Sequence, residues 1–84
     1  MFKNKNSNGD NNLCGKKIVE LRMAMAPKTS QRQLADKLQA IGIDVDKNAI
    51  QRIECGKRFI TDIEIKAFCQ VFEITPNQLF GYID

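Results

Sequence analysis

Apolar residues near the start of the chain recur with the spacing of an α-helix. They follow one another at steps of four, three and four residues, as Cys14, Ile18, Leu21 and Met25. Side chains at this spacing lie on one side of a helix, where they can face a core. Pro27 disfavours helical geometry in the residue before it, so the helix should end near Ala26. The pattern therefore predicts a first helix over residues 13–26.

Four later segments each open with a side chain that can cap a helix. In three of them a Glu or Gln follows three residues later, as the pairs Ser30 with Gln33, Thr61 with Glu64 and Thr75 with Gln78. Such a capping box satisfies amide groups that the start of a helix leaves free. Asp46 is the fourth cap. Helices are expected over 31–41, 47–54, 62–72 and 76–80, with left-handed caps at Gly42, Gly56 and Gly81.

No strand pattern competes with these helices, because the one alternating stretch, 41–45, contains Gly42 and Asp44. We therefore expect an all-α fold, and the length of 84 residues fits one domain. Residues 1–12 hold five Asn but only two apolar residues, which predicts a disordered N-terminal arm before a folded domain over 13–84. Lys3 and Lys5 in this arm either reach along a DNA groove or belong to an unstructured leader.

Charge is distributed unevenly along the chain. Up to Arg58 there are 12 basic and 6 acidic residues, whereas the remainder holds one basic and four acidic residues. A net charge of +6 on one side and −3 on the other indicates a part that faces a polyanion, although a surplus of Lys also serves solubility.

The residue types also limit the chemistry. Cys14, Cys55 and Cys69 are dispersed and the chain has no His, so we expect reduced, mostly buried thiols and neither a metal site nor another cofactor. An enzyme is not expected, since there is no nucleophile beside a base and no phosphate-binding Gly loop. No apolar run approaches the roughly 20 residues that span a bilayer. A cytoplasmic protein without membrane contact is predicted.

Residues 30–56 hold two predicted helices joined through Gly42, which is the arrangement of a helix-turn-helix. In the second helix Ile50 and Ile53 point inward, and Asn48, Gln51, Arg52 and Cys55 lie on the opposite face.

This face suits the major groove of DNA. Asn and Gln can bond adenine edges at two points, and Arg can do the same with guanine. Lys47 lies in the first turn, near the end of the helix that approaches bases. The predicted base-reading set is Lys47, Asn48, Gln51 and Arg52, and the predicted phosphate-binding set is Gln31, Lys57 and Arg58. The alternative is the ordinary solvated face of a surface helix.

Four stretches together resemble the Cro/Xre-type helix-turn-helix domains of bacterial and phage repressors. They are G-K-K-I-V-E-L-R at 15–22, S-Q-R-Q-L-A-D-K-L at 30–38, A-I-Q-R-I-E-C-G-K-R at 49–58 and T-D-I-E-I-K-A-F at 61–68. The resemblance implies a compact five-helix, lambda-repressor-like domain. It also implies a sequence-specific regulator of transcription, with the helix at 47–54 in the major groove of double-stranded DNA.

Individual positions can be carried over from the family in the same way. Gln31 looks like the residue that anchors helix two to phosphate, and Ala35 like the small residue that lets the two helices pack closely. Glu54 and Gly56 match the family's I-E-x-G ending. Three departures are a longer connection from Leu38 to Asp46, Cys55 in a place where Asn is usual, and negative charge from Asp44 and Asp46 beside the expected DNA surface.

The C-terminal part of the chain is more apolar than one buried helix face requires. The helix over 62–72 is apolar nearly all round and is expected at the centre of the domain. The last apolar residues are Leu79, Phe80, Tyr82 and Ile83. They belong either to the core or to a homodimer contact, and a dimer would read two half-sites. The rival to DNA binding is a protein-interaction module, such as an antitoxin-like partner of another protein. No small-molecule effector domain is expected.

Overall fold

The computed structural model describes residues 11–81, and these residues form five α-helices and no strand. The helices are α1 (Gly15–Ala24), α2 (Gln31–Ala40), α3 (Lys47–Glu54), α4 (Asp62–Phe72) and α5 (Pro76–Phe80). The predicted all-α class is confirmed. The limits of α3, α4 and α5 are as predicted, whereas α2 ends one residue earlier and α1 is two residues shorter at each end.

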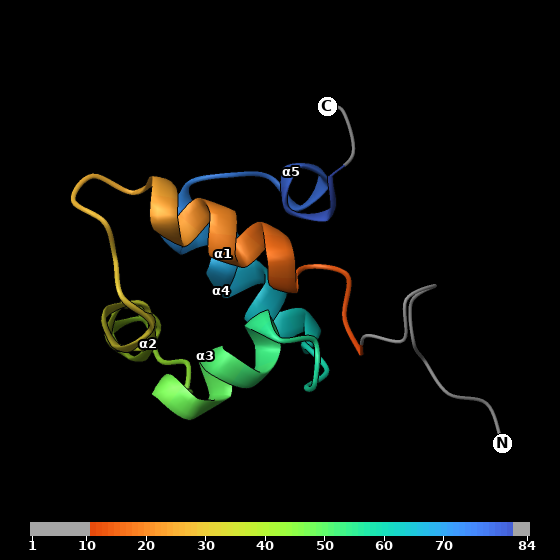
Figure 1. Cartoon of the computed structure of the whole chain (residues 1–84), viewed down its shortest axis with the longest axis horizontal. Helices are drawn as coiled ribbons and strands as arrows, with labels where there is room; N and C mark the ends of the chain where they lie inside the picture. Colours follow the sequence, from red (N-terminus) through yellow and green to blue (C-terminus); the bar gives the residue numbers. More distant parts are fainter. Residues whose placement is uncertain (1–10, 82–84) are drawn as a thin grey trace, which may run out of the picture.

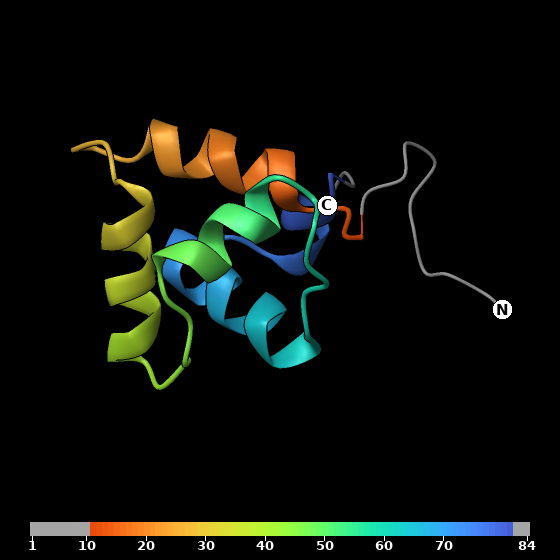
Figure 2. The same ribbon diagram turned by 60° about the horizontal axis from the view of Figure 1, so that its bottom comes forward.

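The helices pack around one core with α3 on the outside. α3 packs against α1 and α2, while α5 packs against α1 and α4. Figure 1 views α2 nearly end-on while α3 runs across the view, so these two helices cross steeply. In Figure 2, α3 lies at the front, with α1 above it and α4 below. One long side of α3 is therefore not covered by another helix.

Local capping explains where four of the helices begin. The hydroxyl of Ser30 accepts from the Gln33 amide at 3.1 Å, and the Gln33 side chain accepts from the Ser30 amide at 2.8 Å. The same reciprocal pair forms at the starts of α4 and α5, and Asp46 caps α3 by accepting from the Ala49 amide at 2.8 Å. All three predicted capping boxes and the Asp46 cap are thus confirmed.

The predicted left-handed caps at Gly42, Gly56 and Gly81 are also present, with φ angles of +91°, +77° and +85°. α4 ends differently, on Glu73 at φ +57°, a position that nothing in its sequence marked.

The long connection between α2 and α3 is held by hydrogen bonds. The Ile43 amide donates to the Leu38 carbonyl at 3.0 Å, and the Gln39 side-chain amide donates to the Val45 carbonyl at 2.7 Å. Val45 itself is buried. These bonds fix the conformation of the connection up to Asp46, the N-cap of α3.

The core draws on every helix. Its buried apolar residues are Cys14, Ile18, Leu34, Ala35, Leu38, Val45, Ile50, Ile53, Ala67, Phe68, Cys69 and Leu79. Complete burial of an Ile, Leu or Phe side chain contributes about 1.5 to 3 kcal/mol. Ile63 on α4 is 67% exposed, so the apolar surplus of that helix does not all enter the core, contrary to expectation.

The cysteines are all free thiols, with Cys14 and Cys69 buried and Cys55 exposed. Burial, reinforced by the neighbouring Cys69, raises the pKa of Cys14 to about 11. Among the helices of residues 11–81, none has the length and apolar character needed to traverse a lipid bilayer.

Candidate nucleic-acid interface

The outer face of α3 carries the whole predicted base-reading set. Ile50 and Ile53 are fully buried on its inner side and fix its rotation about its own axis. On the other side, four exposed residues have side chains without a hydrogen bond or ion pair within residues 11–81: Lys47, Asn48, Gln51 and Arg52. These four exposed side chains therefore lie on the side of α3 opposite the buried Ile50 and Ile53.

Gln31 is less available than its sequence position indicates. It is half-buried, and its side-chain amide donates to a carboxylate oxygen of Glu54 at 2.9 Å. The side chain is therefore engaged within the fold, and its role as a phosphate anchor stays a prediction.

The first turn of α2 still offers groups for a phosphate. The Ser30 hydroxyl satisfies the amide of Gln33, whereas the amides of Gln31 and Arg32 have no partner within residues 11–81. Arg32 is exposed and its guanidinium makes no ion pair there, a feature that the motif comparison missed. An exposed Arg beside free amides at a helix start suits an anion.

The two cations after α3 have different surroundings. Lys57 is exposed, and its ammonium makes no ion pair within the described part of the chain. Arg58 is half-buried and forms a two-point pair with Glu64 at 2.9 and 2.8 Å, with a further bond to the Phe59 carbonyl. This guanidinium also holds the pKa of Glu64 below its ordinary range. The Arg58 side chain is therefore engaged within the fold, whereas Lys57 is unpaired within residues 11–81, and phosphate binding by either residue stays a prediction.

A buried ion pair supports this face from behind. Arg22 on α1 donates two bonds to the Glu54 carboxylate, at 2.8 and 3.0 Å, and one to the Thr29 carbonyl at 3.1 Å. Since Glu54 also accepts from Gln31, one carboxylate connects α1, the start of α2 and the end of α3. Both ion-pair residues belong to the quoted motifs, but nothing in the sequence paired them.

The start of the folded region also contacts α3. Asn11 and Asn12, placed by the prediction in a disordered arm, are hydrogen-bonded to the segment 53–58. The folded region thus includes Asn11 and Asn12, two residues before the predicted boundary. Residues 1–10, with Lys3 and Lys5, lie outside the described residues.

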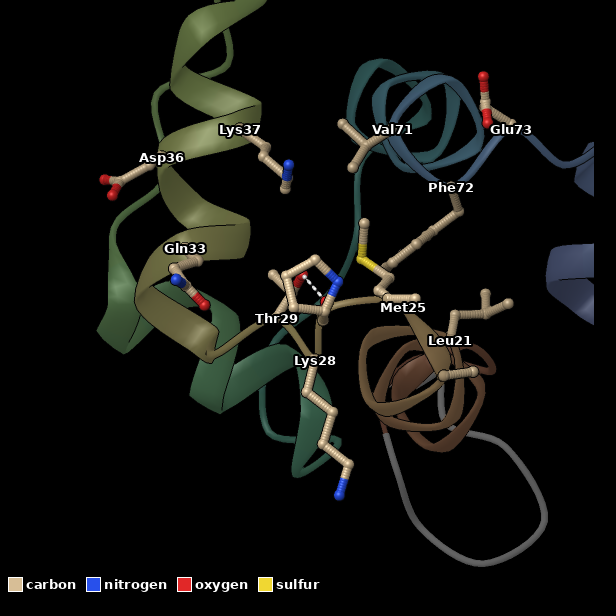
Figure 3. A pocket seen from close by; sticks show the side chains of 13 residues that line it. Leu21, Met25, Lys28, Thr29, Gln33, Asp36, Lys37, Val71, Phe72 and Glu73 are labelled. Atoms are coloured by element: carbon tan, nitrogen blue, oxygen red, sulfur yellow. Dashed lines mark hydrogen bonds between the residues drawn. The ribbon is translucent and has the colours of Figure 1, made fainter.

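A separate hollow of about 650 Å³ lies between the end of α1, the loop after it, α2 and the end of α4 (Figure 3). Its apolar wall comes from Leu21, Met25, Val71 and Phe72, and its charged rim from Lys28, Asp36, Lys37 and Glu73. No residue of α3 lines it. The hollow is therefore distinct from the outer face of α3.

One residue of the predicted dimer contact is buried inside the domain and is not available to a second copy. Leu79 is only 1% exposed and belongs to the core, whereas Phe80 is 37% exposed. Phe80 and the 62% exposed Leu13 border a smaller hollow of about 300 Å³, together with Ile60 and Ile65. Tyr82 and Ile83 lie outside the described residues. Of the predicted dimer residues within 11–81, Phe80 is accessible, and the exposed Leu13 lines the same hollow.

No protein-family model, curated protein or solved structure matches this chain. The likeness to Cro/Xre-type domains therefore depends on the motifs at 15–22, 30–38, 49–58 and 61–68, and membership of that family stays a prediction.

Proposed function

We propose that this protein binds double-stranded DNA sequence-specifically, as a repressor-like regulator of transcription, with α3 in the major groove. The observation that carries the proposal is the outer face of α3. Lys47, Asn48, Gln51 and Arg52 are exposed there without partners in residues 11–81, on a helix whose other side is buried.

The chemistry of this face matches base edges. Asn48 and Gln51 present amides that can bond adenine, and Arg52 presents the fork that recognises guanine. An α-helix with its side chains is about 10 to 12 Å in diameter, and a B-DNA major groove about 12 Å wide admits it. Each two-point contact with a base contributes about 1 to 3 kcal/mol of discrimination.

Two exposed acids, Asp44 and Asp46, lie just before α3. Asp46 caps the helix by accepting from the amide of Ala49, and Glu54 is paired with Arg22 inside the fold. On the outer face of α3 itself, the charged side chains are the cations Lys47 and Arg52. Lys57, Arg32 and the free amides of the α2 start would add phosphate contacts on both sides of the groove.

A homodimer forms part of the proposal, since two copies would read two half-sites about one helical turn apart. Its surface would include Phe80 and Leu13, because both are exposed and apolar, and would extend to Tyr82 and Ile83. Leu79 is left out because it is buried.

A protein-interaction module is the second candidate. It is favoured by large apolar side chains that remain exposed away from α3, such as Phe59 at 53% and Ile63 at 67%. These residues would serve an antitoxin-like protein that binds both a partner protein and DNA.

Selection of bound duplexes from a random DNA pool, at two salt concentrations, tests the proposed function. We expect one sequence class to be enriched, with affinity that falls as salt rises because bound cations release counterions. Failure to enrich any sequence would overturn sequence-specific binding and would favour the protein partner.

A further inference from the structure

We propose that Asn11 and Asn12 are positioning residues for DNA reading, which hold the C-terminal end of α3 in the orientation that base contacts need. The inference rests on the proposed function and adds to it two residues that contact no DNA in this scheme. We refer to the hydrogen bonds of Asn11 and Asn12 to the segment 53–58 as the asparagine clasp.

The clasp begins with the side chain of Asn12. Its amide nitrogen donates to the carbonyls of Ile53 at 3.0 Å and Arg58 at 2.8 Å. Its oxygen accepts from the backbone amides of Cys14 at 3.0 Å and Gly15 at 2.7 Å, at the start of α1. One half-buried side chain therefore joins the start of α1 to the end of α3.

Asn11 completes the clasp one residue earlier. Its backbone amide donates to the Gly56 carbonyl at 2.7 Å, and its side-chain amide donates to the Lys57 carbonyl at 3.1 Å. Both acceptors lie in the turn that follows α3. The backbone and the side chain of Asn11 therefore both bind the turn that carries Lys57.

Gly15 allows this approach. A Cβ atom at Gly15 would lie 2.6 Å from the Ile53 carbonyl oxygen and 2.9 Å from that of Glu54. Both distances are shorter than real Cβ contacts, so only Gly lets the start of α1 lie against the last turn of α3. The closeness of these two helix ends is what brings Asn12 within bonding distance of Ile53.

The orientation of α3 depends on such outside contacts. A helix of eight residues is marginal by itself, so its neighbours determine its position. At its start, the Asp46 cap and the buried Val45 hold it. At its end, the Arg22–Glu54 ion pair and the asparagine clasp hold it.

Specific and general DNA binding should respond differently to loss of the clasp. A two-point contact between a side chain and a base tolerates an error of only about 0.5 Å or 10 to 20°. General attraction to phosphates depends on charge and tolerates small movements. Loss of the clasp should therefore lower the ratio of specific to non-specific affinity, whereas a purely structural role would leave that ratio unchanged in protein that is still folded.

The variant Asn12→Asp separates the two functions of this side chain. Aspartate keeps an oxygen for the amides at the start of α1 but loses the donors to the Ile53 and Arg58 carbonyls. It also removes one unit of positive net charge, so the control is Asn77→Asp, the same change at an exposed position on α5. Affinity is measured for the selected duplex and for a scrambled duplex, at a temperature where circular dichroism shows each protein folded.

We expect the ratio of the two affinities to fall about tenfold for Asn12→Asp, as in partial loss of one base contact, and to stay unchanged for Asn77→Asp. If the wild-type protein prefers the selected duplex and Asn12→Asp shows the same affinity ratio, the role of the clasp is overturned and the proposed function stands. A wild-type protein that binds both duplexes equally would overturn the proposed function, and the clasp with it.

If Asn12→Asp does not fold, Asn11→Ala takes its place in the same measurement. This change leaves the net charge and the backbone bond to Gly56 intact. It removes the bond to Lys57 together with a buried side-chain oxygen that has no partner within residues 11–81, so little stability should be lost. We expect the affinity ratio to fall about two- to threefold through loss of one bond. A ratio equal to that of the wild type would contradict the clasp.

Discussion

The guanidinium of Arg22 on α1 donates two hydrogen bonds to the carboxylate of Glu54 on α3, with lengths of 2.8 and 3.0 Å. Their side chains are only 12% and 4% exposed. A buried pair of this kind is costly to break from one side, because the remaining charge stays in the interior without compensation.

Arg22→Met should therefore destabilise the fold by about 3 to 5 kcal/mol, measured as the free energy of unfolding in urea. The control is Lys17→Met on the same helix, which removes a cation from an exposed pair with Glu20 at 3.9 Å and should cost less than about 1 kcal/mol. Adding Glu54→Met to Arg22→Met should recover part of the loss. Equal costs for the two single variants would contradict a buried, structural pair.

Gly15→Ala should destabilise the fold by about 1 to 3 kcal/mol, because its Cβ would meet backbone oxygens that cannot move as a flexible side chain does. The neighbouring exposed Lys16 is the control, since Lys16→Ala changes no packed contact. Thermal unfolding of both variants measures the difference. A melting temperature for Gly15→Ala at or above that of Lys16→Ala would mean that α1 and α3 are less close than described.

Arg52 and Lys57 should contribute differently to DNA binding. Arg52→Ala is expected to cost about 1 to 3 kcal/mol on the selected duplex and to relax specificity, because it removes a base contact. Lys57→Ala should weaken binding to every duplex and flatten the salt dependence, because it removes a phosphate contact. Titrations of both variants at several salt concentrations measure this. Equal losses on all duplexes for both variants would argue against base reading by Arg52.

The stability of the fold should depend on the ionisation of Glu64. Its pKa is lowered, chiefly by the hydrogen-bonded Arg58, so the stabilisation is fully present above the unfolded value of about 4.3 and is lost as pH falls through the folded pKa. Glu64→Gln keeps an acceptor for the Thr61 amide but has no charge to lose. The measurement is the difference in unfolding free energy between wild type and Glu64→Gln from about pH 7 to about pH 2.5. A difference that does not shrink in acid would exclude this contribution.

Alkylation should distinguish the three thiols. Cys55 is exposed and should react with iodoacetamide in the native protein, whereas Cys14 and Cys69 are buried and should react only after unfolding. The pKa of Cys14, raised to about 11, slows its reaction further. Peptide mass mapping identifies the modified residues.

The same reaction serves as a footprint. Cys55 follows α3 directly, beside the proposed reading face, so a bound selected duplex should protect it from iodoacetamide. Undiminished modification of Cys55 in a saturated complex would place the DNA elsewhere on the molecule.

Features determined by neighbouring residues were predictable from the sequence. Ser30 and Gln33, three residues apart, complete each other's hydrogen bonds whatever the rest of the chain does, and so the start of α2 was predicted correctly. Helical spacing alone predicts that the side chains of Ile50 and Ile53 face the core, and it also identified the outer face of α3.

Features that depend on distant residues were not predictable. Arg22 and Glu54 are 32 residues apart, and Asn12 lies 46 residues before Arg58, so no local pattern pairs them. Arg58 looked like a free cation because it follows a cap glycine, whereas the turn after it brings Glu64 within 2.8 Å. The surroundings of Gln31 and Leu79 were not predictable for the same reason, because other elements provide them.

The division of α3 into two sides has a consequence for how binding specificity can diverge. Ile50, Ile53 and Glu54 hold the helix, while the side chains of Asn48 and Gln51 make no hydrogen bond within residues 11–81. Substitutions at the outer positions are thus nearly free of folding constraints. Under the proposed function, exchange of a few outer side chains would change the DNA sequence that is recognised while the scaffold stays the same.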